Sequence, residues 1–117
     1  MKYLCLTYQE GERPDARTEA QSDSLLAEGL AYGEELRASG HGIASGVLQP
    51  EWTTTIRVRH GKVSFADGPN AAKRDALGGF YLIEAIDLND AIRVAAKMPA
   101  ARLGCVEIWA IKECRSG

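Results

Sequence analysis

The sequence has no excess of positive charge, no long apolar run and no pairable set of cysteines. Its 117 residues include 14 lysines and arginines against 16 acidic residues, a net charge of −2. Such a chain lacks the cationic field that holds phosphate backbones, so we expect no nucleic-acid partner. Its apolar runs, such as Leu77–Ile83, are shorter than the roughly 18 residues of a membrane span, so we expect no membrane association.

Cysteine usage and motifs exclude further classes of protein. Cys5, Cys105 and Cys114 are an odd number without a CxxC pair, which does not fit a secreted disulfide framework. We therefore expect a cytoplasmic protein with reduced thiols. The chain has no glycine-rich phosphate loop, no nucleophile elbow, no HExxH motif and no cysteines with histidines beside them, so we expect no cofactor and no metal.

The 45% apolar and 26% charged composition is typical of a globular chain, and the length predicts one domain over residues 1–117. Pattern and breaker residues predict strands, helices and turns in alternation. The expected elements are a strand at Met1–Tyr8, a helix from the Thr18 cap to Ser39, a segment at Gly42–Leu48, a hairpin at Thr53–Ala66 turning at His60-Gly61, a helical turn at Ala71–Leu77, a strand at Gly78–Ile86, a helix at Leu88–Met98 capped by Asp87 and stopped by Pro99, and a strand at Gly104–Lys112.

This order predicts the fold class. A helix after the first strand and another before the last, with antiparallel strands between them, is typical of an α+β ferredoxin-like sandwich. We expect an antiparallel sheet with two helices on one face, plus an added β-hairpin.

The strands indicate what happens on the other face of the sheet. In the last strand Cys105, Glu107, Trp109 and Ile111 share one face, and the opposite face is also apolar, because side chains alternate along a strand. A strand that is apolar on both faces in so short a chain predicts burial against a second subunit, and hence a homodimer. The alternative is that the hairpin and the loop Gln9–Arg17 cover this face.

One long segment carries a family resemblance. Asp67–Ala101 reads DGPNAAKRDALGGFYLIEAIDLNDAIRVAAKMPAA. Together with the opening MKYLCLTY and the helix ending EELRASG, it resembles the YCII-related proteins, specifically their DGPF branch, over nearly the whole chain. The resemblance implies a ferredoxin-like chain that pairs through its sheet into a dimeric α+β barrel.

The resemblance implies less about activity. In the wider group a histidine on the first helix forms a proposed catalytic dyad with an aspartate, and one branch is associated with dehydrochlorination of a chlorinated hydroxyquinol. Here Gly29 stands where that histidine is expected, and Asn70 replaces the phenylalanine of the DGPF motif. The dyad is therefore not carried over.

His41 and Asp67 are the candidate catalytic residues. A histidine paired with a carboxylate across the barrel entrance is a general base whose pKa lies close to the working pH. The alternatives are structural, because His41 ends the first helix, where it can interact with free carbonyls, and Asp67 can bond to the backbone amides of its own turn.

Seven further residues are candidate ligand-binding groups. Glu84 and Glu107 interrupt apolar strands and need partners, for which Arg57 and Arg59 are candidates. Such a pair marks a pocket if it points into the barrel and is a cross-strand contact if it points to an edge. Tyr32 lies beside Gly33 on the first helix. Gly29 and Gly33 destabilise this helix, and the two explanations for them are close packing of the helix on the sheet and a cavity beside it. The full set is Tyr32, Arg57, Lys73, Arg74, Asp75, Glu84 and Glu107, with solvated charge as the alternative for Lys73, Arg74 and Asp75.

Two functions follow from these observations. The first is a dimer that binds a small organic molecule in or near its barrel in a regulatory role. The second, which the family resemblance implies, is a cofactor-independent enzyme, lyase-like or dehydrochlorinase-like, that acts on an aromatic or halogenated compound and uses His41 and Asp67 for proton transfer.

Overall fold

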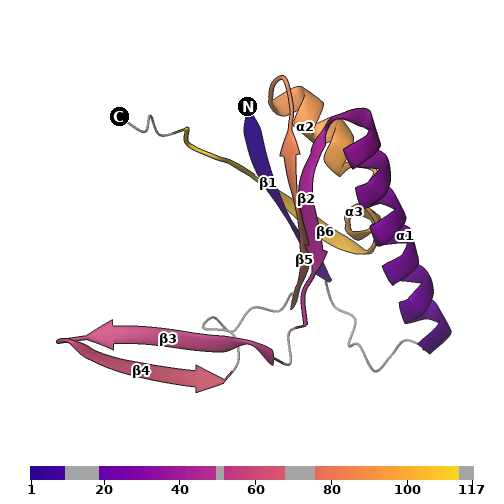
Figure 1. Cartoon of the computed structure of the whole chain (residues 1–117). Helices are drawn as coiled ribbons and strands as arrows, with labels where there is room; N and C mark the ends of the chain where they lie inside the picture. Colours follow the sequence, from indigo (N-terminus) through magenta and orange to yellow (C-terminus); the bar gives the residue numbers. More distant parts are fainter. Residues whose placement is uncertain (10–18, 50–51, 68–75, 114–117) are drawn as a thin grey trace.

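The computed structural model describes residues 1–9, 19–49, 52–67 and 76–113. Figure 1 shows a sheet with all its helices on one side and a hairpin that stands apart. The elements in chain order are β1 (Lys2–Gln9), α1 (Glu19–Ser39), β2 (Gly42–Val47), β3 (Thr54–Arg59), β4 (Lys62–Asp67), β5 (Ala76–Glu84), α2 (Leu88–Ala95), α3 (Pro99–Leu103) and β6 (Gly104–Ala110).

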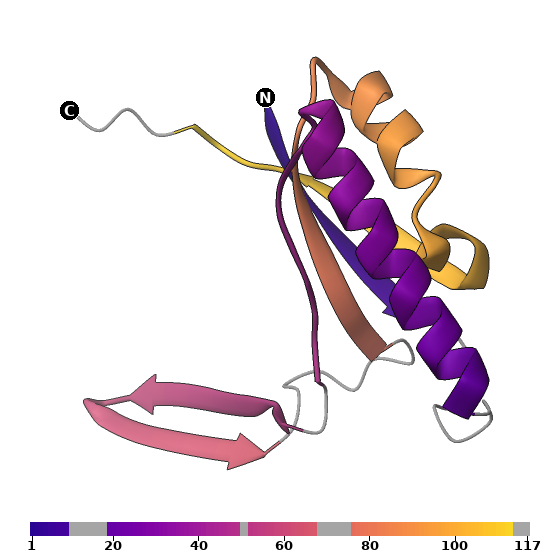
Figure 2. The same cartoon turned by 45° about the vertical axis from the view of Figure 1, so that its right-hand side comes forward.

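Four strands form an antiparallel sheet in the order β2-β5-β1-β6. Helices α1, α2 and α3 lie on one face of this sheet, as the two views in Figures 1 and 2 agree. This arrangement confirms the α+β fold class predicted from the sequence. The opposite face carries no helix among the described residues, and it is called the open face below.

The core lies between the helices and the sheet. The largest fully buried side chains are those of Ile83, Cys5 and Met98. The register pairs Ile83 with Tyr3 and Cys5 with Tyr81, so Ile83 and Cys5 lie on the helix-covered side of the sheet. Burial raises the pKa of the Cys5 thiol to about 11. Cys5 therefore acts as a small apolar core residue rather than as a reactive thiol.

Helix α1 approaches the sheet closely at its glycines. The Tyr81 hydroxyl donates a 2.9 Å hydrogen bond to the Gly29 carbonyl, and a Cβ added at Gly33 would lie 2.9 Å from Ser45 Oγ. These contacts confirm close helix-to-sheet packing, the first of the two explanations for these glycines.

Some predicted boundaries were wrong, and Pro99 is the most instructive. Pro99 was expected only to stop the preceding helix, but it also begins α3, because proline lacks the N–H that goes unused in a first helical turn. Helix α2 ends at Ala95 and β6 at Ala110, both earlier than expected. Ala76 and Leu77 belong to strand β5, not to a helical turn, while Thr18 and residues 71–75 lie outside the described residues.

The predicted hairpin is confirmed and forms its own two-stranded sheet, here called the arm (Thr54–Asp67). His60 and Gly61 have φ of 54° and 76°, as a two-residue type I′ turn requires. The arm projects away from the helices in both views (Figures 1 and 2). The radius of gyration, 16.1 Å, accordingly exceeds the value of about 13 Å for a compact chain of roughly this length.

Candidate functional site

The open face is largely apolar. The register places two rows of side chains across it, Leu82–Leu4–Trp109 and Phe80–Leu6–Glu107. The leucines and Phe80 are half-buried, and Trp109 is 57% exposed. The strand alternation seen in the sequence therefore leads to a broad apolar face that holds the Glu107 carboxylate, while Glu84 lies at the end of the same face.

That carboxylate, Glu107, is hydrogen-bonded by two aromatic residues. The Tyr8 hydroxyl donates to Glu107 Oε1 at 2.9 Å, and the Trp109 indole N–H donates to the same oxygen at 3.1 Å. Tyr8 pairs with Cys105 and therefore lies on the same open face as Glu107. Because Tyr8 is itself buried, its hydroxyl holds the carboxylate in a fixed position on that face. These donors differ from the expected Arg57 or Arg59, which lie on the arm.

The arrangement suits recognition of a hydroxyl group on a planar ligand. A carboxylate offers about four acceptor positions and no donor, and a hydrogen bond to a charged acceptor is stronger than a neutral one. The aromatic and leucine side chains around Glu107 provide the apolar surroundings that small-molecule sites use.

A second polar cluster lies where α1 ends and α2 begins. His41 Nε2 lies 3.5 Å from Asp90 Oδ2, and His41 Nδ1 lies 3.1 Å from Ser39 Oγ. Asp90 is buried and accepts hydrogen bonds from the Ile86 backbone N–H and from Arg93, each at 3.0 Å. The structure thus brings His41 to Asp90 rather than to the expected Asp67, which ends β4 at the base of the arm.

The Ser39–His41–Asp90 order resembles a nucleophilic triad, but the hydrogen bonds do not support that chemistry. The Ser39 hydroxyl donates to the Leu36 carbonyl at 3.0 Å, so its oxygen can only accept from His41. A base that is to activate serine must instead receive the hydroxyl proton. The cluster fastens the end of α1 to the start of α2.

Asp90 has a lowered pKa with an identifiable cause. The Ile86 backbone N–H contributes most to holding the pKa of Asp90 below its ordinary value, and Arg93 and His41 add to this against the opposing effect of burial. The same residue belongs to the N-terminal cap of α2, since its own N–H donates to Asp87 Oδ1 at 2.9 Å. Its charge is therefore part of how the helix begins.

Replacing Asp90 with asparagine is expected to destabilise the protein at neutral pH and to have little effect in strong acid. A carboxyl with a depressed pKa in the folded state contributes stability above its ordinary pKa, 3.8. That contribution is lost as the pH falls through the folded-state value. Urea denaturation of wild type and Asp90→Asn from pH 7 to pH 2 measures the difference.

The control is Asp87→Asn, because asparagine caps a helix about as well as aspartate. We expect its stability to follow wild type across the pH range. An Asp90→Asn variant that is as stable as wild type at pH 7 would contradict the assigned role.

The remaining predicted site residues lie apart from one another. Tyr32 donates to the Val94 carbonyl at 2.7 Å, and burial, followed by nearby Glu35, raises its pKa to about 12, so it ties α1 to α2. Glu84 lies 2.7 Å from the ammonium group of Met1, and this contact lowers its pKa. Lys73, Arg74 and Asp75 lie outside the described residues.

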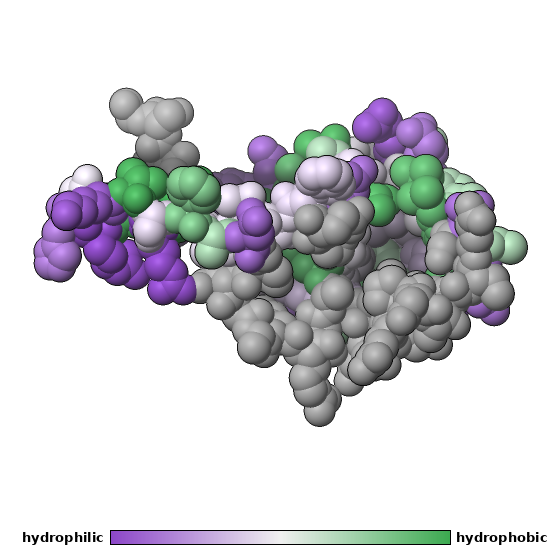
Figure 3. All heavy atoms as spheres, turned by 90° about the horizontal axis from the view of Figure 1, so that it is seen from below, coloured by the Kyte–Doolittle hydropathy of each residue, from purple (hydrophilic) through white to green (hydrophobic). Residues whose placement is uncertain are grey.

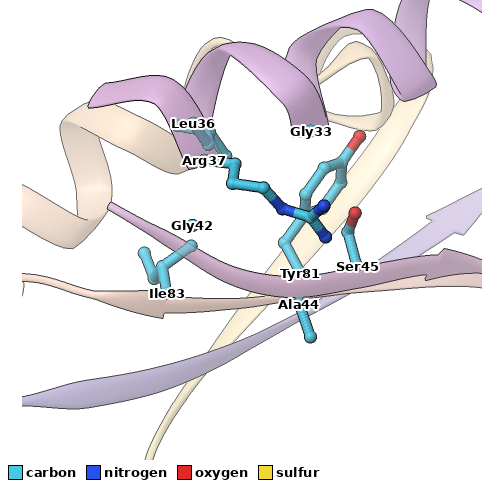
Figure 4. A pocket seen from close by; sticks show the side chains of 8 residues that line it. All are labelled: Gly33, Leu36, Arg37, Gly42, Ala44, Ser45, Tyr81 and Ile83. Atoms are coloured by element: carbon cyan, nitrogen blue, oxygen red, sulfur yellow. The ribbon is translucent and has the colours of Figure 1, made fainter. Parts of the chain in front are cut away.

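A small hollow under α1 does not supply an organic ligand site. It is lined by Gly33, Leu36, Arg37, Gly42, Ala44, Ser45, Tyr81 and Ile83 (Figure 4). Its volume of about 10 Å³ has room for roughly one water molecule. This hollow is therefore too small for an aromatic ligand.

The described ranges contain neither a metal-ligating cluster nor a membrane-spanning helix. No group of three or more histidine, cysteine or acidic side chains there is placed to hold a metal ion. None of the described helices is both long and apolar enough to cross a membrane.

Comparison with known proteins gave a family and one informative structure. The sequence profile of the YCII-related domain matches residues 1–115, while no curated protein matches the chain. A similar solved structure is 5-chloro-2-hydroxyhydroquinone dehydrochlorinase (TftG) from Burkholderia phenoliruptrix AC1100, in complex with 2,5-dihydroxybenzoquinone. It is 20% identical, with a TM-score of 0.52, over 97% of this chain and 96% of that chain. At this identity the likeness concerns the fold.

Proposed function

Because the chain belongs to the YCII-related family, we propose that it is a homodimer that binds a small hydroxylated aromatic molecule between its open faces, in a regulatory role. The DGPF branch, a single domain over residues 1–117 and a cytoplasmic location are parts of the same proposal. The hydrogen-bonded Glu107 on an apolar face is the observation that carries it.

The dimer is supported by the surface that the single chain leaves exposed. A continuous half-buried apolar patch is formed by Leu4, Leu6, Phe80 and Leu82. Because every subunit carries the same patch, two copies of the chain can pair through it. Two such faces stack about 10 Å apart when sheets pack. A twofold pairing of this kind is the commonest arrangement in soluble oligomers.

The ligand class is supported by the chemistry around Glu107. The carboxylate accepts hydrogen bonds, and the flanking Trp109 ring offers a flat apolar contact, so a neutral phenol or hydroquinone fits better than an anion. The dehydrochlorinase of similar fold was solved with a hydroxylated quinone bound, which supports the same chemical class as a choice of probe.

Replacing Glu107 with glutamine is expected to weaken binding of chlorohydroquinone at least tenfold. A tenfold loss corresponds to about 1.4 kcal/mol, which is just below the roughly 1.5–3 kcal/mol that a hydrogen bond to a charged group contributes. Quenching of tryptophan fluorescence during anaerobic titration measures the dissociation constant.

Two controls separate this role from a general loss of charge. Glu84→Gln removes a carboxylate from the end of the same face and is expected to bind chlorohydroquinone like wild type. The dimethyl ether of the same ligand has no hydroxyl to donate, so its weak binding should be the same in wild type and Glu107→Gln. Equal affinity of wild type and Glu107→Gln for chlorohydroquinone would refute the site.

The second candidate function is a cofactor-independent lyase, which is favoured at the level of fold by the dehydrochlorinase. Such an enzyme would remove a proton and a chloride from 5-chloro-2-hydroxyhydroquinone and form a hydroxyquinone. His41 and Asp67 are the residues proposed from sequence for the proton transfer, although His41 pairs with Asp90 here. Chloride release that depends on protein, and falls in His41→Gln or Asp67→Asn, would favour this function over simple binding.

A further inference from the structure

The arm has one apolar face and one cationic face. Its register pairs Ile56 with Phe65 and Val58 with Val63, so these four side chains share a face. All four are between 54% and 75% exposed. The other face carries Arg57, Arg59 and Lys62. In Figure 3 the arm, at the left, shows hydrophobic spheres next to hydrophilic ones.

A hairpin of this kind needs a covering surface. A two-stranded sheet alone in water is marginally stable at best, and it needs further strands or packing against another element. Within the part of the chain that the structure describes, the arm pairs with no strand of the four-stranded sheet, and the views in Figures 1 and 2 place it away from the helices. Its regular type I′ turn and full register nevertheless indicate a structure that the sequence specifies.

The arm and the open face lie on the same side of the molecule. In Figures 1 and 2 the arm leaves the lower end of the sheet on the side opposite the helices. Anything stacked on the open face therefore lies beside the arm. Each arm strand has six residues, which span about 20 Å, whereas stacked sheets lie about 10 Å apart. The arm is long enough to pass a stacked second sheet and reach the helices behind it.

The helix layer of this chain offers a surface of matching charge. Helix α1 contains five acidic residues and a single arginine, and it exposes Leu26 and Leu30. Arg59 and Lys62 form the last pair of the arm's register, directly beside its turn, so the tip of the arm is cationic. Opposite charges on two surfaces favour and orient their association.

We propose that the arm packs on a second copy of this chain, with its apolar face against the partner and its tip near the partner's α1. The proposal rests on the homodimer proposed above and adds to it a second contact region outside the stacked sheets. Each subunit gives one arm and receives one, as twofold symmetry requires.

The test is a pair of asparagine substitutions at neighbouring positions of β4. Phe65→Asn removes the largest side chain of the apolar face, while Ser64→Asn changes the opposite face, and neither alters the charge. Analytical ultracentrifugation over a concentration series measures the dimer dissociation constant of the full chain. We expect at least a tenfold increase for Phe65→Asn and a change of less than twofold for Ser64→Asn.

Amide hydrogen exchange gives an independent readout of the arm. We expect the arm amides of the wild type to be protected at concentrations where dimers form and to exchange at least tenfold faster after dilution to monomers. Circular dichroism should show the same folded body in all variants, because the arm is separate from the four-stranded sheet.

The outcomes distinguish this proposal from the proposed function. A dimer that is unaffected by Phe65→Asn, with arm amides that exchange equally fast at all concentrations, overturns the arm contact but leaves the stacked dimer intact. A wild type that is monomeric at all concentrations overturns both. The arm amides could also become protected from exchange only after anionic lipid vesicles or nucleic acid are added. That result would identify the added molecule, rather than a second copy of the chain, as the partner of the arm, and it would overturn the proposal.

Discussion

Replacing Leu82 with aspartate is expected to produce a folded monomer. Leu82 lies in the centre of the open face, opposite Leu4, and it is half-buried in the single chain. In a dimer with stacked open faces, the substitution removes an apolar side chain from each subunit, worth roughly 1.5–3 kcal/mol apiece when fully buried. It also places two carboxylates in the interface, where desolvation costs several kcal/mol more.

The dimer dissociation constant should therefore rise by at least about 10³-fold, which corresponds to about 4 kcal/mol. Light scattering after gel filtration, over a range of loading concentrations, measures the shift from dimer to monomer. Leu88→Asp is the matched control, because this leucine is 52% exposed and begins α2 on the helix side. If Leu82→Asp remains a dimer with the affinity of wild type, the subunits do not pair through this face.

The fold followed from sequence because each element has a local cause. The alternation in Gly104–Lys112 assigned Glu107 and Trp109 to one face, and the β1–β6 register places both there. The turn residues His60 and Gly61 specified the arm. Pro99 was misjudged because a proline that stops one helix can also begin another, and the local sequence does not distinguish the two cases.

The polar clusters were harder to predict, because their partners are far apart along the chain. His41 and Asp90 meet only after α1 and α2 pack on the same face of the sheet. One signal for Asp90 was present, since an acidic residue three positions after the Asp87 cap forms the second half of a capping pair. Tyr8 and Glu107 required the register between the first and last strands, which periodicity alone does not provide.

Replacing Ile83 with alanine is expected to lower the stability of the fold and leave dimer affinity unchanged, whereas replacing its neighbour Leu82 with aspartate weakens the dimer and leaves the subunit folded. Ile83 is fully buried on the helix-covered face, so its truncation leaves a cavity in the core. Substitutions of this kind cost roughly 2–5 kcal/mol, a large part of the stability of a domain. Because Ile83 points away from the open face, the folded variant should keep the dimer affinity of wild type.

Subunit association contributes to the apparent stability of a dimer, so the cost of Ile83→Ala is best measured by urea denaturation in the monomeric Leu82→Asp background. Ile83→Val removes a single methyl group and should cost only roughly 0.5–1.5 kcal/mol. A loss below about 1 kcal/mol for Ile83→Ala, or weaker dimerisation without loss of stability, would contradict the assignment of these two faces. Two adjacent residues of β5 thus separate folding from association, because strand alternation directs one side chain to the core and the next to the partner.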